Sequence, residues 1–190
     1  MELTLGLVIG ICLSAACGFR VFVPLLGVSV ASLTGHVHLA SGFEWLGSWP
    51  ALIAFATATV VEVGTYYIPW VDNAMDALMT PVAVAAGVIV TASLLGDVSP
   101  FLRWSLAVIA GGGVSGVVHT GTVAARAASS GTTCGTANFL VSTAELAGSI
   151  VVTILAVLLP FLCLVGVIWI CYRMITTITR SGLFKRRGDT

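Results

Sequence analysis

Charged residues are scarce in this sequence: eight Lys and Arg and eight Asp and Glu make up 8% of its 190 residues, whereas 58% are apolar. A typical soluble domain has about 25% charged residues. So few charges cannot form a surface compatible with water, and the apolar patches left exposed would drive association. The composition therefore excludes an ordinary soluble domain and favours a protein whose solvent is the lipid bilayer.

A net positive charge is also lacking, since the acidic and basic residues balance to a formal charge of zero. Nucleic-acid binding depends on Lys and Arg that neutralise phosphates, so no nucleic acid is expected as a partner. The basic residues instead gather after the last apolar run, at Arg180, Lys185, Arg186 and Arg187. The positive-inside bias then predicts that residues 181–190 form a cytoplasmic tail.

The motifs that mark enzymes and metal sites are missing. The sequence contains no HExxH, no phosphate-binding glycine loop ending in Lys, and no CxxC. Four of the five cysteines lie inside apolar runs without the paired spacing of a zinc site. We therefore expect no enzyme activity, no metal and no cofactor.

What the sequence has in excess is long apolar runs, and a membrane-spanning helix needs about 20 such residues. Candidate spans are Leu3–Leu33, Ala51–Ile68, Asn73–Leu95, Phe101–Ala128 and the double-length run Asn138–Ile178. Polar segments at Thr34–Pro50 and Ser129–Thr136 are predicted as loops. Only helices or closed barrels satisfy the backbone in lipid, so the predicted fold is an all-α membrane protein forming one domain over residues 1–190.

Two of these runs do not match a single span. Leu3–Leu33 is too long for one helix and too short for two, so we expect either a strongly tilted helix or one broken near Gly18 or Pro24 that re-enters the membrane. The last run is about two spans long, and Pro160 near its middle indicates a tight turn or, alternatively, one long kinked helix. Counting the last run twice gives about six crossings, with both chain ends in the cytoplasm.

A weak internal symmetry accompanies this count. Each half has an Arg in a segment of small residues, then a span with a lone Glu, then a span with a Pro. Residues 1–97 and 98–180 are therefore candidates for a 3+3 inverted repeat, an arrangement found in many secondary transporters. Chance similarity between apolar segments is the alternative.

Ionisable residues inside the predicted spans are the candidate functional residues. Each costs about 2.5–3.5 kcal/mol at the centre of a helix, so it needs a partner or a purpose. We expect Arg20 and Arg126 to face a shared cavity near mid-membrane and to bind an anion, because a guanidinium matches carboxylate and phosphate oxygens. The alternative is that Arg and Glu simply pair and lock the bundle. The predicted substrate-binding residues are Arg20, Arg126, His119 and Asn138, and the predicted counter-charges or coupling sites are Glu62, Glu145, Asp76 and Asp72.

Helical spacing refines some of these assignments. His119, Thr122 and Arg126 share one helical face, where His119 would either shuttle protons or bond a neighbouring helix. Gly112, Gly116 and Thr120 form a line of small residues, which we interpret as a packing surface. Asp72 is predicted to cap the helix that starts at Asn73.

Several segments together resemble a known family. In order they are GFRVFVPLL (18–26), EVGTYYIPWVDNAMDALMTPVAVAAG (62–87), HTGTVAARAASS (119–130) and NFLVSTAE (138–145). They resemble the motifs of a bacterial membrane family, the domain of unknown function 4126. That resemblance supports the fold and the choice of polar residues, but it names no substrate.

Three functions follow as hypotheses. The first is a small transporter or translocase of the bacterial inner membrane that binds an anionic solute or a lipid phosphate group through Arg20 and Arg126. The second is a cation or proton channel lined by Glu and Asp. The third is a scaffold that binds other membrane proteins without transport. The expected partners are the lipid bilayer, the anionic solute or lipid head group, and a second copy of the chain in a homodimer.

Overall fold

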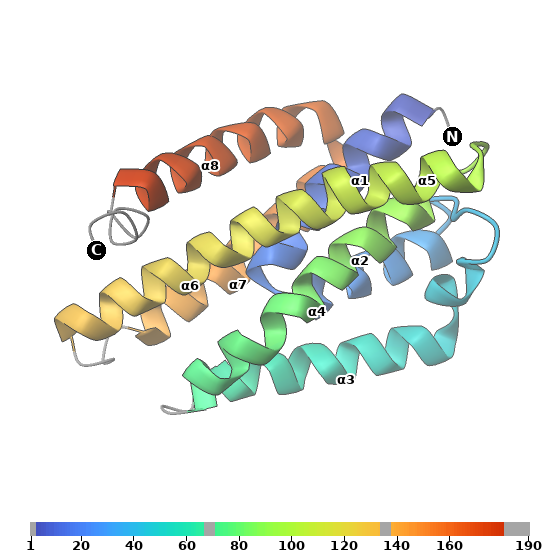
Figure 1. Ribbon diagram of the computed structural model, residues 1–190. Coiled ribbons are helices and arrows are strands. Elements are labelled where there is room, and N and C mark those ends of the chain that lie inside the picture. Colours follow the sequence, from blue (N-terminus) through green and yellow to red (C-terminus); the bar gives the residue numbers. More distant parts are fainter. Residues whose placement is uncertain (1–2, 67–70, 134–137, 181–190) are drawn as a thin grey trace.

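The computed structural model describes residues 3–66, 71–133 and 138–180, and within these ranges every regular element is helical (Figure 1). The all-α prediction is therefore confirmed for the described part of the chain. Four helical segments in it are long and apolar enough to cross a membrane: Met75–Leu94, Pro100–Ser130, Asn138–Leu158 and Pro160–Thr177. The other apolar helices are shorter, and the predicted count of six crossings is not confirmed by length and composition alone.

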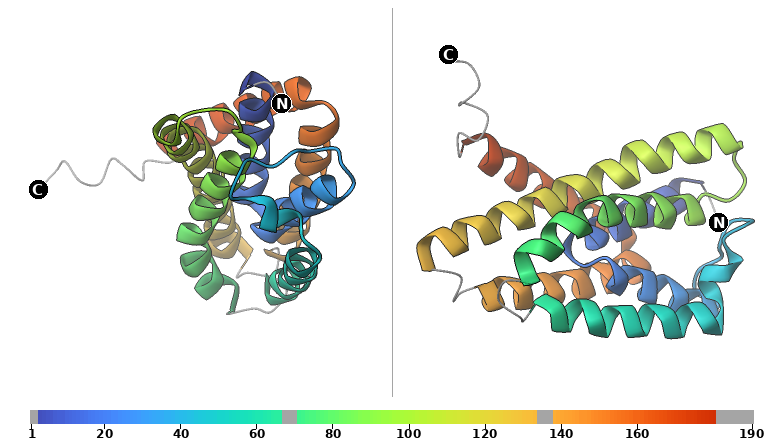
Figure 2. Two further views of the ribbon diagram at one scale, coloured as in Figure 1. Left: turned by 90° about the vertical axis from the view of Figure 1, so that its right-hand side faces the viewer. Right: turned by 60° about the horizontal axis from the view of Figure 1, so that its bottom comes forward.

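The first apolar run is broken, as one of the two alternatives predicted. Helix α1 spans Leu3–Phe19 and α2 spans Phe22–Leu33. Pro24 lies in the first turn of α2 and cannot donate a hydrogen bond to the carbonyl of Arg20 four residues earlier, so one continuous helix would be interrupted here. The chain reverses at the break, and α2 returns toward the end of the molecule at which α1 began (Figures 1 and 2).

Two helices follow the predicted Thr34–Pro50 loop, which itself contains a short 3-10 helix, η1 (Glu44–Gly47). Helix α3 spans Trp49–Tyr66 and α4 spans Val71–Leu94, with Pro81 inside α4. The prediction that Asp72 caps this helix is wrong, because α4 begins at Val71, two residues before the predicted start, and Asp72 lies in its first turn. The Asp72 side chain lies outside the described atoms, as does Ile68, the predicted end of the second span.

The next segment is a continuous helical run with an irregular middle. It comprises α5 (Pro100–Leu106), the π-helical turn η2 (Ala107–Gly112) and α6 (Gly113–Thr133). Ser99 caps α5 by accepting a hydrogen bond from the Leu102 N–H at 3.4 Å. The predicted loop at Ser129–Thr136 is wrong in its first part, since α6 continues through Thr133.

The last apolar run forms two helices, α7 (Asn138–Leu158) and α8 (Pro160–Arg180). They run in opposite directions and reverse at Leu159, so the alternative of one long kinked helix is excluded (Figure 1). The start of α1 and the end of α8 consequently lie at opposite ends of the bundle (Figures 1 and 2). The prediction that both chain ends are cytoplasmic is not confirmed by this arrangement of helices.

Small residues let the central helices approach closely. A Cβ on Gly18 of α1 would lie 2.6 Å from the Val118 Cβ, and one on Gly111 would lie 2.5 Å from the Gly87 carbonyl oxygen. Gly112 meets Val88 and Val84 of α4 in the same way, which agrees with the packing interpretation of that glycine line. Helix α1 is the centre of the bundle, in contact with α4, α6, α7 and α8.

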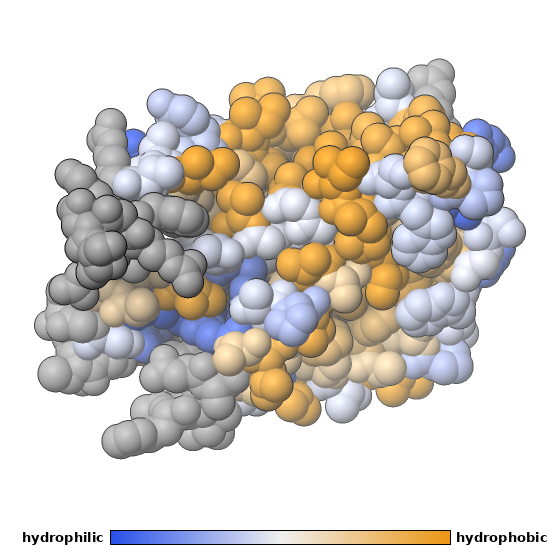
Figure 3. Space-filling view, viewed as in Figure 1, coloured by the Kyte–Doolittle hydropathy of each residue, from blue (hydrophilic) through white to orange (hydrophobic). Residues whose placement is uncertain are grey.

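Apolar side chains dominate the outer surface. Large hydrophobic residues are exposed along most helices, and α8 presents many of them, among them Phe161, Leu162, Val165, Ile168 and Trp169. Figure 3 shows apolar residues spread over the middle of one face. This surface matches the acyl region of a bilayer better than water.

Candidate functional site

The break between α1 and α2 exposes backbone groups inside the bundle, and Glu62 of α3 satisfies two of them. Its Oε1 accepts a hydrogen bond from the Val21 N–H at 2.9 Å, and its Oε2 accepts one from the Phe22 N–H at 3.1 Å. No side chain of α2 itself caps this helix start. Glu62 is 2% exposed, so it serves as a buried anionic cap at the positive end of a helix.

The carbonyls at the end of α1 are satisfied from two other helices. His119 Nδ1 on α6 lies 3.2 Å from the Gly18 carbonyl oxygen, and since that oxygen can only accept, Nδ1 carries the hydrogen. Ser149 Oγ on α7 donates to the Ala16 carbonyl at 3.1 Å. The broken helix is therefore held by polar side chains from three neighbouring helices, which is what backbone buried in a membrane requires.

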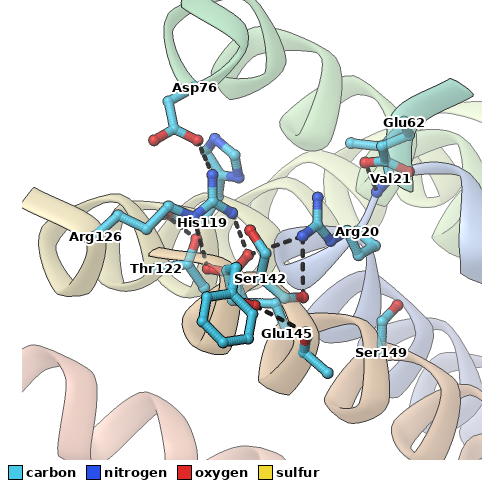
Figure 4. Close-up of polar contacts among 12 residues, drawn as sticks. Arg20, Val21, Glu62, Asp76, His119, Thr122, Arg126, Ser142, Glu145 and Ser149 are labelled. Atoms are coloured by element: carbon cyan, nitrogen blue, oxygen red, sulfur yellow. Dashed lines mark hydrogen bonds and ion pairs between the residues drawn. The ribbon is translucent and has the colours of Figure 1, made fainter. Parts of the chain in front are cut away.

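A network of charged side chains lies next to this break (Figure 4). Arg126 of α6 forms a two-bonded pair with Glu145 of α7: its Nε donates to Glu145 Oε1 at 3.1 Å, and its Nη2 donates to Oε2. Its remaining nitrogen, Nη1, donates to Asp76 Oδ1 of α4. Arg126 is 2% exposed, so its contacts with these two carboxylates are shielded from water.

Arg20 reaches the same carboxylate from the tip of the α1–α2 hairpin. Its Nη2 lies 3.5 Å from Glu145 Oε2 and donates to the Ser142 carbonyl oxygen at 3.1 Å. Arg20 and Arg126, which are 106 positions apart in the sequence, therefore meet on one oxygen atom. We refer to Arg20, Glu62, Asp76, Arg126 and Glu145 as the charge cluster.

The charge cluster has more negative than positive groups. Three carboxylates and two guanidiniums give a formal charge of −1, since 2 − 3 = −1. All five residues are buried, with exposures between 1% and 7%. A net charge in this environment favours the approach of a proton or another cation.

The charge cluster lies toward one end of the bundle. Glu145 follows the first residue of α7, Asn138, by seven positions, which is about 10 Å along a helix that is about 30 Å long. Arg126 precedes the last residue of α6, Thr133, by the same number of positions. The charge cluster therefore lies about a third of the way along the bundle from the end at which α6 ends and α7 begins.

Two openings approach the charge cluster. A cavity of about 510 Å³ lies between α2, α3 and α4, where Glu62 and Thr57 are joined by apolar residues, Phe22, Ala54, Ala58, Val61, Met75 and Met79. Figure 3 shows a separate hollow between the start of α4 and the end of α6, with hydrophilic residues on its floor. Both openings are on sides of the bundle that face the surrounding medium.

The structure brings most of the predicted residues together. Arg20, Arg126, Glu62, Asp76 and Glu145 form the charge cluster, and His119 lies beside it (Figure 4). Asn138 lies two turns before Glu145, where its Nδ2 donates to Ser130 Oγ at 3.0 Å and ties α7 to α6. Thr122 donates to the His119 carbonyl within its own helix at 2.8 Å.

Two contributors were not predicted, Ser142 and Ser149. Ser142 is 1% exposed and provides the carbonyl for Arg20, and Ser149 bonds the end of α1. Their spacing with Glu145 on α7, at positions three before and four after it, is the sequence signal that marks one polar face on an otherwise apolar helix.

Within the described residues, no group of three or more His, Cys, Asp or Glu is placed to hold a metal ion. Cys12, Cys17 and Cys163 are buried as free thiols, and Cys134 lies outside the described residues. The guanidiniums and carboxylates of the charge cluster can form ion pairs and hydrogen bonds with an oxygen-bearing or charged ligand.

The fold and the site together define a helical membrane protein with a buried ion-pair network at a broken helix. Comparison with known families matches residues 7–180 to the family described as Domain of unknown function (DUF4126). The chain belongs to this family, as its motifs indicated. No curated protein and no solved structure matches the chain.

Proposed function

We propose that the protein is a small membrane transporter or translocase that binds an anionic solute or a lipid phosphate group at Arg20 and Arg126. The observation that carries this proposal is that both guanidiniums reach Glu145 Oε2, although they come from the hairpin tip and from α6. Two convergent guanidiniums form a site for one anionic oxygen, and Arg is the residue best suited to bind carboxylate or phosphate.

The broken helix supports transport over a purely structural role. Irregular backbone at membrane depth is tolerated where it is buried in protein or lines a cavity, and discontinuous helices mark the binding sites of many transporters. The α1–α2 break lies beside both the charge cluster and the cavity lined by Glu62. A bundle that needed only stability would be served as well by an unbroken apolar helix.

We further propose five crossings, formed by α3, α4, the α5–α6 run, α7 and α8, with α1–α2 as a re-entrant hairpin. At one end of the bundle Arg103 is the only basic side chain among the described residues, where it donates to the Gly96 and Ser41 carbonyls. Helix α8 ends at the other end, and Lys185, Arg186 and Arg187 follow it in the sequence. The positive-inside bias makes this second end cytoplasmic in a bacterial inner membrane. The 3+3 repeat and the homodimer stay predictions.

Direct binding tests the function. The purified protein in phosphatidylcholine nanodiscs would be titrated with dimethyl phosphate, a singly charged phosphodiester. Loss of a charge-assisted bond worth about 1.5–3 kcal/mol predicts roughly 10- to 150-fold weaker binding in Arg20→Gln and Arg126→Gln. Arg103→Gln is the matched control at the opposite end and should bind as the wild type does. Equal affinity in all four proteins, or no binding, would remove the arginines from any anion site.

A cation or proton channel is the second candidate, and the excess of one carboxylate in the charge cluster favours it. Bilayer recording separates the two functions, because steady unitary currents carried by cations support a channel and electrically silent uptake supports a transporter. A scaffold without transport predicts neither current nor anion binding.

A further inference from the structure

We infer that Glu145 occupies the position that an anionic ligand takes when bound, so that binding requires Glu145 to leave the two guanidiniums and to accept a proton. This inference rests on the proposed function and specifies its coupling: one proton enters with each singly charged anion. Glu145 is then a competitor built into the binding site.

The geometry of Glu145 is that of a bound ligand. Both of its oxygens bond Arg126 side-on, and Oε2 also faces Arg20, so the carboxylate fills the space between two guanidiniums (Figure 4). A carboxylate or phosphate from outside would use the same paired N–H groups. Arg20 and Arg126 are only 1% and 2% exposed, so an incoming anion that uses these paired N–H groups must displace Glu145.

Charge balance requires the proton. The groups that face Glu145 are Arg20 from the hairpin, Arg126 with His119 nearby on α6, and Asp76 from α4, while Glu62 from α3 bonds the backbone of α2. The charge cluster has a formal charge of −1, and a singly charged anion would raise it to −2 inside the bundle. Burying this additional negative charge away from water is strongly unfavourable. If Glu145 changes from COO⁻ to COOH as the anion binds, the charge stays at −1.

Two buried polar atoms near Glu145 have no hydrogen-bond partner among the described residues. Ser142 Oγ, one turn before Glu145 on α7, has no hydrogen-bond partner among the described residues and can accept the hydrogen of a protonated Glu145. His119 Nε2 also has no partner in the described part of the chain, and since Nδ1 carries the ring hydrogen, Nε2 has a free lone pair. His119 is 2% exposed and lies beside Arg126 (Figure 4).

The test compares anion affinity at two pH values in variants of Glu145. Dimethyl phosphate is suitable because its charge stays constant between about pH 5.5 and about pH 7.5, so any dependence on pH comes from the protein. In the wild type, affinity should rise as pH falls, by up to about tenfold per pH unit for one linked proton. Glu145→Gln should bind more tightly than the wild type at the higher pH, by at least about tenfold, and should lose the pH dependence.

Further variants separate displacement from a general effect of charge. Glu62→Gln removes the same charge from the charge cluster but no contact with a guanidinium, so its affinity should still depend on pH. Glu145→Asp keeps a carboxylate on a shorter side chain and should also keep the pH dependence. Glu44→Gln, at an exposed carboxylate in η1, is the surface control and should match the wild type.

The outcomes distinguish the inference from the proposed function. If Arg20→Gln and Arg126→Gln weaken binding but the wild type and Glu145→Gln show the same affinity and pH dependence, Glu145 is not the competitor and only this inference is overturned. If Glu145→Gln does not fold, the wild type and Glu145→Asp decide, because affinity independent of pH in both contradicts the linked proton. Nanodiscs with phosphatidylglycerol test an anionic lipid as the source of the phosphate, since such a lipid should weaken the binding of dimethyl phosphate relative to phosphatidylcholine nanodiscs.

Discussion

Replacing Glu62 should loosen the hairpin tip specifically. Glu62 accepts hydrogen bonds from the Val21 and Phe22 N–H groups at 2.9 and 3.1 Å, and these donors begin a helix with no cap of its own. A hydrogen bond to a charged group contributes about 1.5–3 kcal/mol, so Glu62→Ala should lower the free energy of unfolding by about 3–6 kcal/mol. Glu62→Gln keeps one acceptor oxygen and should cost about half of this.

Hydrogen exchange measured by mass spectrometry locates the effect. In Glu62→Gln, peptides that contain Val21 and Phe22 should exchange roughly 10- to 150-fold faster, because local opening becomes easier by about 1.5–3 kcal/mol. Peptides from α7 and α8 should change much less. Glu44→Gln is the matched control, since Glu44 also accepts a backbone bond, from the Gly42 N–H at 2.8 Å, but in an exposed loop. Unchanged exchange at the hairpin tip in Glu62→Gln would refute the capping role.

Three more predictions follow from the packing and the charges. Gly111→Ala should destabilise the protein by about 1–3 kcal/mol in thermal unfolding, because its new Cβ would meet the Gly87 carbonyl, whereas Gly113→Ala, with nothing within 4 Å, should be neutral. Arg126→Gln should lower the unfolding free energy by about 3–5 kcal/mol and by more than Arg20→Gln, since Arg126 pairs with two carboxylates, and a smaller loss would show that the pairs are weak. Reporters fused to the two chain ends should report opposite sides of the membrane, with the C-terminus cytoplasmic, and signals from one side would contradict the hairpin topology.

The sequence identified the residues of the charge cluster because ionisable groups are conspicuous in apolar runs. Arg20, Glu62, Arg126 and Glu145 each stand alone among hydrophobic neighbours, and the cost of burying them made each a candidate. Their pairing did not follow from the sequence. Arg20 meets Glu145 across 125 positions, and only the packing of α1 against α7 sets that contact.

For the α1–α2 hairpin too, the sequence predicted one part of the structure and the packing of the helices decided the rest. Pro24 and the length of the first run predicted a break, since proline cannot donate the bond that a continuous helix needs. Glu62 of α3, a helix that starts later in the chain, accepts hydrogen bonds from the N–H groups of Val21, directly before α2, and of Phe22, its first residue. The reversal at this break puts the start of α1 and the end of α8 at opposite ends of the bundle (Figures 1 and 2).

By itself the sequence determined that the protein is suited to a lipid bilayer, that its fold is helical, and which charged residues are candidates for burial. These depend on composition and on hydrogen bonds between residues a few positions apart. Tertiary structure alone decided that two arginines share one carboxylate and that the charge cluster lies toward one end of the bundle. It also decided that Glu62 of α3 caps the start of α2. Such contacts join side chains from distant segments, and their geometry is fixed only when the helices pack against one another.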